Sequence, residues 1–195
     1  MNFLAHFHLS GENELIAIGN FLGDFVRGNE LKKLPPTIQK GVYLHRFIDQ
    51  YTDNHPRVRE LNKILVPYFA KYAPVVSDIY FDYFLASNFS AYSDISLRDY
   101  THNVYNIMER NLNHFTPRAS RFYHFMIARD IFFEYGNKGG MQHVFNGLSN
   151  RAAFDSKMEN GVEVLTKHED EMRGLFEDFY PQLQQASLKH LSQLT

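Results

Sequence analysis

Histidine and aspartate side chains suited to catalysis are densest in the stretch LHRFIDQYTDNH. On a helix His45, Asp49 and Asp53 are spaced i, i+4 and i+8, so they share one face. Two carboxylates one turn apart repel each other and Asp is a poor helix former, so this face needs a compensating charge. A divalent cation would supply it, because imidazole and carboxylate together suit Mn²⁺, Fe²⁺ or Zn²⁺. The alternative is a solvated face whose acids pair with neighbouring arginines.

A second pair of carboxylates, Asp78 and Asp82, is also spaced by one turn, in the most aromatic predicted helix. Buried charges are rare unless they are paired or bound to a metal. Asp78 has another explanation, because Pro74 opens this helix and the first turn of a helix favours negative charge. Asp82 is therefore the stronger candidate ligand.

Asp24 lies in the stretch GNFLGDFVRGN, near the end of a predicted apolar helix. The helix dipole disfavours an anion at that end, and the neighbouring glycines allow another backbone to approach closely. An acid in an unfavourable position suggests a functional role. The alternative is an ion pair with Arg27, three residues further on.

His6 and His8 lie in the N-terminal segment, where they alternate with apolar residues. If the segment is extended, both imidazoles point the same way, whereas in a helix they diverge. Two histidines on one side of a short apolar segment are candidates for acid and base chemistry. The alternative is that each is a structural histidine with its own hydrogen-bond partners.

The elements that must position these residues are predicted to be helices, because apolar residues recur at three- and four-residue spacing and hairpin signals are missing. We expect an all-α fold, a single compact multi-helix domain over residues 1–195. The first helix is expected over about 11–26, with Ser10 as its N-cap and Gly28 after its end. The other helices are expected at about 36–54, 56–72, 74–91, 96–113, 116–135, 141–148 and 154–180, with a C-terminal helix from Pro181.

Composition excludes several classes of function. The chain has 195 residues, 20 basic and 22 acidic side chains, and no cysteine. Near-zero net charge argues against a nucleic-acid partner, and the lack of cysteine excludes disulfides and thiol chemistry. No window reaches the roughly 18 apolar residues of a membrane span, and no signal peptide is evident, so we expect no membrane partner and a cytoplasmic location. No phosphate-binding loop or serine-hydrolase elbow occurs.

Five blocks together resemble the acyl carrier protein phosphodiesterase family, and they occur in that family's order and spacing. They are NFLAHFHL, GNFLGDFVRGN, HRFIDQYTDNHPRVRE, the D-x-x-x-D-x-F-L run at 78–85 and NGLSNR at 146–151. The resemblance implies a helical fold distantly related to the HD-domain phosphohydrolases. It also implies a Mn²⁺-dependent hydrolysis, with Mg²⁺, Fe²⁺ or Co²⁺ as alternative ions. The reaction would remove 4′-phosphopantetheine from holo-acyl carrier protein and leave the apo-protein.

Residue by residue, the resemblance places Asp24, His45 and Asp49 at the metal. The side chains it places nearby are His6, His8, Asp78 and Asp82. The chain departs from the family pattern at Tyr83 and Phe89, where relatives often carry His and Trp. If that His protonates the leaving group or binds the metal, another residue must take its role here.

Our mechanistic hypothesis is that the metal, held by some of Asp24, His45, Asp49 and Asp82, binds the phosphate and a water whose pKa it lowers. A carboxylate or His6 takes the proton, and a protonated His6 or His8, or the metal, stabilises the departing serine oxygen. Arg27 and Arg46 are candidates for gripping the phosphate, because guanidinium binds its oxygens bidentately. The catalytic residues of this hypothesis are His6, His8, Asp24, Arg46 and Asp49.

The carrier protein implied by the resemblance is small and acidic, so a chain of net charge −2 needs a local basic patch to bind it. The best candidates are Lys32, Lys33, Arg57 and Arg59, with Lys63 beside them. The alternative is that these side chains form an ordinary solvated face.

Two other functions fit the same residues. One is an HD-like phosphohydrolase that acts on a nucleotide or another small phosphoester. The other is a non-catalytic helical module that binds an acidic partner and uses its Asp and His clusters only as hydrogen-bonded networks.

Overall fold

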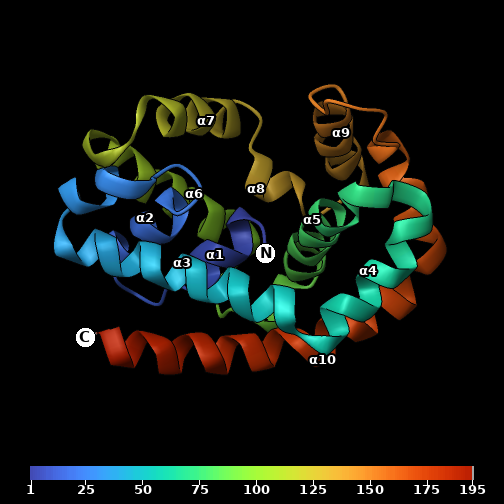
Figure 1. The fold of residues 1–195 in the computed structure, drawn as a ribbon, viewed down its shortest axis with the longest axis horizontal. Helices are drawn as coiled ribbons and strands as arrows, with labels where there is room; N and C mark the ends of the chain where they lie inside the picture. The colour runs from blue at the N-terminus through green and yellow to red at the C-terminus, as the bar shows by residue number, and fades with distance from the viewer. Residues whose placement is uncertain (195) are drawn as a thin grey trace.

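The computed structural model describes residues 1–194, and every regular element in that range is a helix (Figure 1). The all-α prediction is confirmed. The α-helices are α1 (Phe3–His8), α2 (Glu14–Leu22), α3 (Pro36–Asn54), α4 (Pro56–Phe69), α5 (Ala73–Ser87), α6 (Leu97–Arg110), α7 (Pro117–Ile127), α8 (Ile131–Glu134), α9 (Lys138–Ser149) and α10 (Gly161–Leu194). The 3₁₀ turns are η1 (Gly28–Lys33), η2 (Ala70–Tyr72), η3 (Phe89–Ala91), η4 (Leu112–His114) and η5 (Met158–Asn160).

The first predicted helix differs from the observed ones at both ends. The N-terminal segment is helical (α1), so the extended alternative for His6 and His8 is wrong. Ser10 is not an N-cap, because its hydroxyl donates to the His6 carbonyl. Asn13 caps α2 instead, and its side chain accepts from two backbone N–H groups of the first turn. Helix α2 also ends earlier than expected, at Leu22.

The predicted helix at 116–135 is interrupted, whereas the two predicted C-terminal helices are joined. Asp130 adopts a left-handed conformation (φ 47°) and separates α7 from α8. Helix α10 is kinked at His168, which has non-helical angles inside the predicted helix at 154–180, but it continues without a break through Pro181. Proline cannot donate to the preceding turn, but Tyr180 and Leu183 beside it are fully buried, and this packing supports the continuous helix.

Helices α2 and α3 cross at two glycines. A Cβ atom at Gly19 would lie 2.0 Å from the Ile38 carbonyl oxygen, and one at Gly41 would lie 2.2 Å from the Ile16 oxygen. Only glycine permits so close an approach. The crossing therefore holds the polar face of α3 beside the end of α2.

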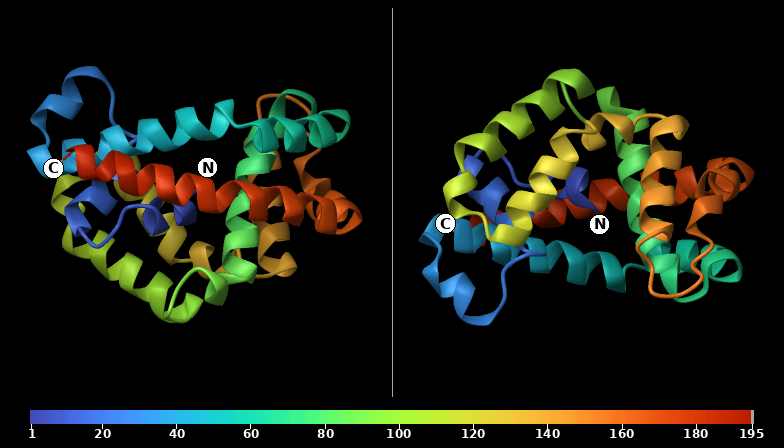
Figure 2. Two further views of the ribbon diagram at one scale, coloured as in Figure 1. Left: turned by 90° about the horizontal axis from the view of Figure 1, so that it is seen from below. Right: turned by 90° about the horizontal axis from the view of Figure 1, so that it is seen from above.

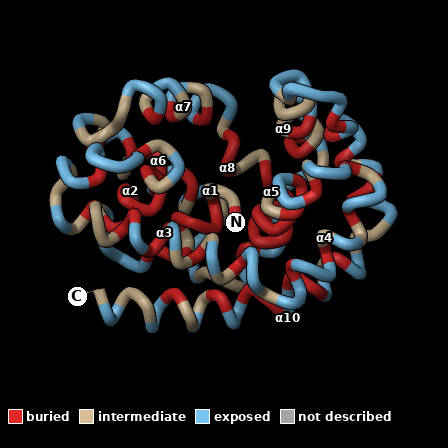
Figure 3. Tube along the Cα trace, viewed as in Figure 1, coloured by how far each residue is buried: buried red, intermediate tan, exposed pale blue. Residues whose placement is uncertain are grey.

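The core surrounds α1 and α5, which are mostly buried and lie in the middle of the molecule (Figure 3). Helix α10 runs along the molecule beside α3 and α4 (Figure 2). No helix within residues 1–194 is long and apolar enough to cross a membrane. The N-terminus lies at the centre of the fold, where α1 packs against α2 and α5 (Figure 1).

Candidate active site

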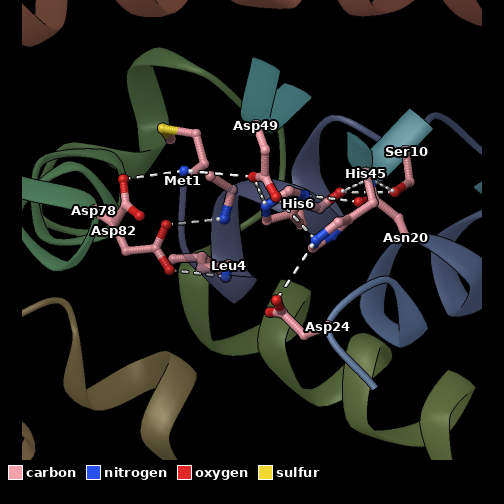
Figure 4. A network of polar contacts seen from close by, with 11 residues as sticks. Met1, Leu4, His6, Ser10, Asn20, Asp24, His45, Asp49, Asp78 and Asp82 are labelled. Atoms are coloured by element: carbon pink, nitrogen blue, oxygen red, sulfur yellow. Dashed lines mark hydrogen bonds and ion pairs between the residues drawn. The ribbon is translucent and has the colours of Figure 1, made fainter. Parts of the chain in front are cut away.

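Three side chains from two helices converge beside the N-terminus. The Asp49 carboxylate lies 3.2 Å from His6 Nε2 through one oxygen and 3.0 Å from His45 Nε2 through the other (Figure 4). The two imidazole rings stack with their centres 4.2 Å apart. Both histidines are buried, whereas the Asp49 side chain is 41% exposed. One potential ligand atom from each residue lies within 4.8 Å of the others, which is a spacing suited to one metal ion.

The local sequence explains how α3 contributes two members of this cluster. His45 and Asp49 are one turn apart and share a face, as the spacing predicts. Gly23 leaves room for the imidazole of His45, because a Cβ atom there would lie 2.1 Å from its Cγ. Asp24 follows, and its carboxylate lies 3.6 Å from His45 Nε2. The structure therefore brings Asp24 to the cluster without an ion pair to Arg27.

Asn20 sets the orientation and the tautomer of His6. The Asn20 amide NH₂ donates to the His6 carbonyl (2.8 Å) and to the Ser10 hydroxyl (2.9 Å). Its carbonyl oxygen is therefore the atom that faces His6 Nδ1, 2.7 Å away, and Nδ1 must carry the proton. This arrangement directs the other ring nitrogen, Nε2, at Asp49.

The buried Nε2 of His6 shows that the cluster fits a cation. This atom has no hydrogen-bond partner among the described residues, although the Asp49 carboxylate faces it. Burial, and then the charge of His45, lowers the pKa of His6, so its neutral ring presents a lone pair. A lone pair aimed at a carboxylate oxygen is unfavourable unless a positive charge lies between them. Neutral imidazole and carboxylate are suitable ligands for a divalent transition metal.

Without a metal, His45 carries the compensating charge. Burial alone would lower the pKa of His45, but hydrogen bonds and charges from Asp24 and Asp49 raise it to about 9. Burial would likewise raise the pKa of both aspartates, and contact with His45 lowers it instead. Around the cluster the three carboxylates of Asp24, Asp49 and Asp78 outnumber the two cations, which are His45 and the N-terminal ammonium group, so an additional positive charge is favourable there.

The N-terminal ammonium group lies on the other side of Asp49. It contacts Asp78 at 3.1 Å and Asp49 at 3.8 Å (Figure 4). Asp78 is therefore near the cluster, as the family resemblance implies, but it is paired with this ammonium group.

Asp82 has a different role from the predicted one. Its carboxylate is fully buried and accepts hydrogen bonds from the backbone N–H groups of Leu4 (2.8 Å) and Ala5 (3.1 Å). These are free donors in the first turn of α1, so Asp82 caps that helix from α5. Burial raises the pKa of Asp82 to about 7. Its two oxygens are directed at α1, so the structure does not support Asp82 as a metal ligand.

His8 and Arg46, which we expected among the catalytic residues, are directed away from the cluster. In helix α1 the His8 ring diverges from His6 and contacts the Tyr92 carbonyl oxygen (3.1 Å) and the Tyr180 hydroxyl (2.7 Å). Arg46 is exposed, and its guanidinium carbon lies 5.9 Å from the centre of the Tyr43 ring. Residue 46 is one position from His45, so helix geometry turns it to another face.

Tyr83 and Phe89, the two departures from the family pattern, also lie outside the cluster. The Tyr83 hydroxyl donates to Glu169 of α10 at 2.8 Å. The Phe89 ring packs against Tyr100 and His8. Tyr83 therefore contacts α10, whereas its neighbour Asp82 contacts α1, so the two side chains lie on different faces of α5.

The predicted basic patch is divided. Lys32 and Lys33 precede α3, whereas Arg57 and Arg59 follow it, so the 19 residues of α3 separate them by about 27 Å. Arg57 is paired with two carboxylates, those of Glu60 and Asp178. These side chains do not form one surface.

A different group of basic residues lies beside the cluster. Asp24 and Arg27 line a groove whose other cationic side chains are Arg118, Arg121 and Arg151. The arginines of α7 were missed because nothing local in the sequence relates them to residues about 90 positions earlier. Asn20 was missed as well, although a polar residue in the apolar run LIAIGNFL was a usable signal.

Comparison with known proteins shows which family the chain is similar to. Residues 1–183 match the family described as acyl carrier protein phosphodiesterase. Three curated relatives from different strains of Escherichia coli, each named acyl carrier protein phosphodiesterase, are 33% identical over 193 residues. The alignments cover 98% of this chain and 100% of each relative. No solved structure matches the chain, so its expected relation to HD-domain phosphohydrolases stays a prediction.

Proposed function

The chain belongs to the acyl carrier protein phosphodiesterase family, whose members are hydrolases, and we propose that it removes 4′-phosphopantetheine from holo-acyl carrier protein in a metal-dependent reaction. Water adds its oxygen to phosphorus, and the bond from phosphorus to the serine oxygen breaks. The serine oxygen takes a proton, so the products are the apo-protein and 4′-phosphopantetheine. The reaction would take place in the cytoplasm.

The observation that carries the proposal is the unpaired Nε2 of His6, buried opposite Asp49 and stacked on His45. His6, His45 and Asp49 would hold the ion, with Asp24 beside them, and Mn²⁺ is the ion we favour. A bound divalent ion neutralises phosphoryl oxygens and lowers the pKa of water. Asn20 keeps His6 in the tautomer whose Nε2 is free to bind a metal.

The residues of the groove would bind and orient the substrate. Asp24 is 52% exposed and also lines the groove, so its carboxylate can hold the attacking water and accept its proton. Arg27 lines the groove with it, and a guanidinium binds phosphate oxygens with two parallel hydrogen bonds. Fixed positive charge beside the phosphate also stabilises the charge that develops in the transition state.

The direct test is incubation with holo-acyl carrier protein and Mn²⁺, followed by intact mass spectrometry of the carrier protein. We expect loss of the phosphopantetheine mass increment, and we expect a chelator to prevent it. An unchanged carrier mass at catalytic metal concentrations would refute the proposal.

Two further measurements separate the alternatives. A small-phosphoester hydrolase would convert nucleotides without any carrier protein. A non-catalytic module would neither contain a stoichiometric transition metal by elemental analysis nor bind added Mn²⁺.

A further inference from the structure

The groove beside Asp24 is strongly cationic. Four arginines line it, from the segment before η1 (Arg27), from α7 (Arg118 and Arg121) and from the end of α9 (Arg151). Asp24 is the only carboxylate among the described residues that line it. None of the four guanidinium groups is in an ion pair with a described carboxylate. The groove can therefore accept an anion next to the candidate metal cluster.

An apolar cavity of about 570 Å³ adjoins this groove, and its wall is formed by residues of the N-terminal segment, α5, α7, α8 and α9. This volume is typical of a small-molecule site. Apolar side chains form much of its wall, and amide side chains supply polar groups. The amides belong to Asn2, Asn146 and Asn150.

The groove and the cavity share part of their wall. The residues common to both are Phe3, Phe122, Phe125, Leu148 and Arg151. Asp24 lines the groove only, whereas Arg129 and Glu134, which carry opposite charges, line the cavity only. The combined site therefore runs from an anion-binding end beside the cluster to a mainly apolar end beyond it. Its complement is a chain with an anionic head and an uncharged tail that carries amides.

We propose that the groove binds the phosphate of the substrate and that the adjoining cavity binds its pantetheine chain, an assignment that rests on the proposed function. Pantetheine is uncharged and linear and contains two amides, which can pair with the asparagine side chains of the wall. The phosphate lies among the arginines, and the carrier protein then remains outside the groove. The cavity thus distinguishes a pantetheine-bearing serine from other phosphoesters.

Gly147 provides a direct test, because it lines the cavity and a Cβ atom there would have only the tip of Arg151 as a neighbour, at 4.0 Å. Gly147→Leu should fill the cavity without disturbing α9, since Leu is a better helix former than Gly. The matched control is Gly174→Leu in α10, where nothing lies within 4 Å and no groove or cavity is lined.

Calorimetric titrations with pantetheine, 4′-phosphopantetheine and inorganic phosphate separate the two subsites. We expect Gly147→Leu to weaken binding of both pantetheine compounds at least about tenfold and to change phosphate binding much less, because Gly147 lines the cavity and not the groove. Arg121→Gln should weaken the two phosphate-bearing ligands and spare pantetheine, and Gly174→Leu should bind all three as the wild type does.

Failure of this assignment differs from failure of the proposed function. Equal pantetheine binding by Gly147→Leu and wild type, or none by wild type, overturns the assignment even if holo-carrier protein is hydrolysed. If wild type does not hydrolyse holo-carrier protein, the proposed function fails, and the titrations still decide whether the cavity binds pantetheine.

Discussion

At the scale of single residues, the site depends on which group each ring nitrogen of the two stacked histidines contacts. Asn20 directs one nitrogen of His6 at Asp49 by binding the other. His45 faces both Asp49 and Asp24 through Nε2, while its Nδ1 is buried without a hydrogen-bond partner among the described residues. Asp49 contacts both rings, so it is the residue on which the cluster most depends.

Replacing Asp49 by Asn should lower kcat for holo-carrier protein by about 10³-fold or more, because the variant loses an anionic ligand and the negative charge that faces both imidazoles. Circular dichroism should show the wild-type helix content. Asp53→Asn is the matched control, since Asp53 lies one turn further along α3 and is exposed. Turnover by Asp49→Asn within a few fold of wild type would remove Asp49 from the mechanism.

The pKa of His45 predicts a pH-dependent stability of the metal-free protein. The folded-state pKa of about 9 exceeds the unfolded value of 6.5. The stabilisation is therefore complete below pH 6.5 and is lost as the pH rises through about 9. Urea unfolding in a chelator, from about pH 6 to about pH 10, should show this decline, and His45→Gln should reduce it. Parallel curves for the two proteins would contradict the assignment.

At the scale of helices, two tertiary contacts hold the cluster in place: a close helix crossing and a helix cap supplied by another helix. The glycines of α2 and α3 permit a close crossing, and a carboxylate of α5 caps the short helix α1. A helix of six residues is not stable alone, so α1 and with it His6 depend on these tertiary contacts.

Gly41→Ala should destabilise the fold by about 3 kcal/mol, because the added methyl group meets the Ile16 carbonyl oxygen and forces α2 and α3 apart. In contrast, Gly174→Ala in an open part of α10 should stabilise the protein by about 0.5 to 1 kcal/mol. Urea denaturation measures both changes. Equal stability of Gly41→Ala and wild type would contradict the close crossing.

Asp82→Asn should reduce the free energy of unfolding by about 2 kcal/mol, since a single amide oxygen replaces two acceptors for the N–H groups of Leu4 and Ala5. If Asp82 acts only as a cap, Mn²⁺ affinity of the folded variant should stay within a few fold of wild type. A large loss of metal affinity with unchanged stability would restore Asp82 as a ligand.

At the scale of the whole molecule, charge is distributed unevenly although the net charge is only −2. Four arginines gather at one groove from elements far apart in the chain, while Lys32 and Arg57 lie at opposite ends of α3. The field that attracts an acidic carrier protein is thus expected at the groove and its rim.

Raising NaCl from about 50 mM to about 500 mM should increase KM for holo-carrier protein several-fold and change kcat much less, because salt screens the encounter. An Arg118→Gln variant should have a higher KM at low salt and a weaker salt dependence. Lys32→Gln should behave as wild type, because Lys32 does not line the groove. If Lys32→Gln alone flattens the salt dependence, the carrier protein binds at η1.

The sequence by itself determined the helical class and the shared face of His45 and Asp49, because helical periodicity relates residues three or four positions apart. It also predicted α3 between two prolines and the cap at Ser96, which are local effects. Only the tertiary structure decided that His6 joins this pair while His8 does not, that Asp82 caps α1, and that arginines of α7 lie beside Asp24. These contacts depend on the angles and distances at which helices cross, and no local pattern specifies how two distant helices pack.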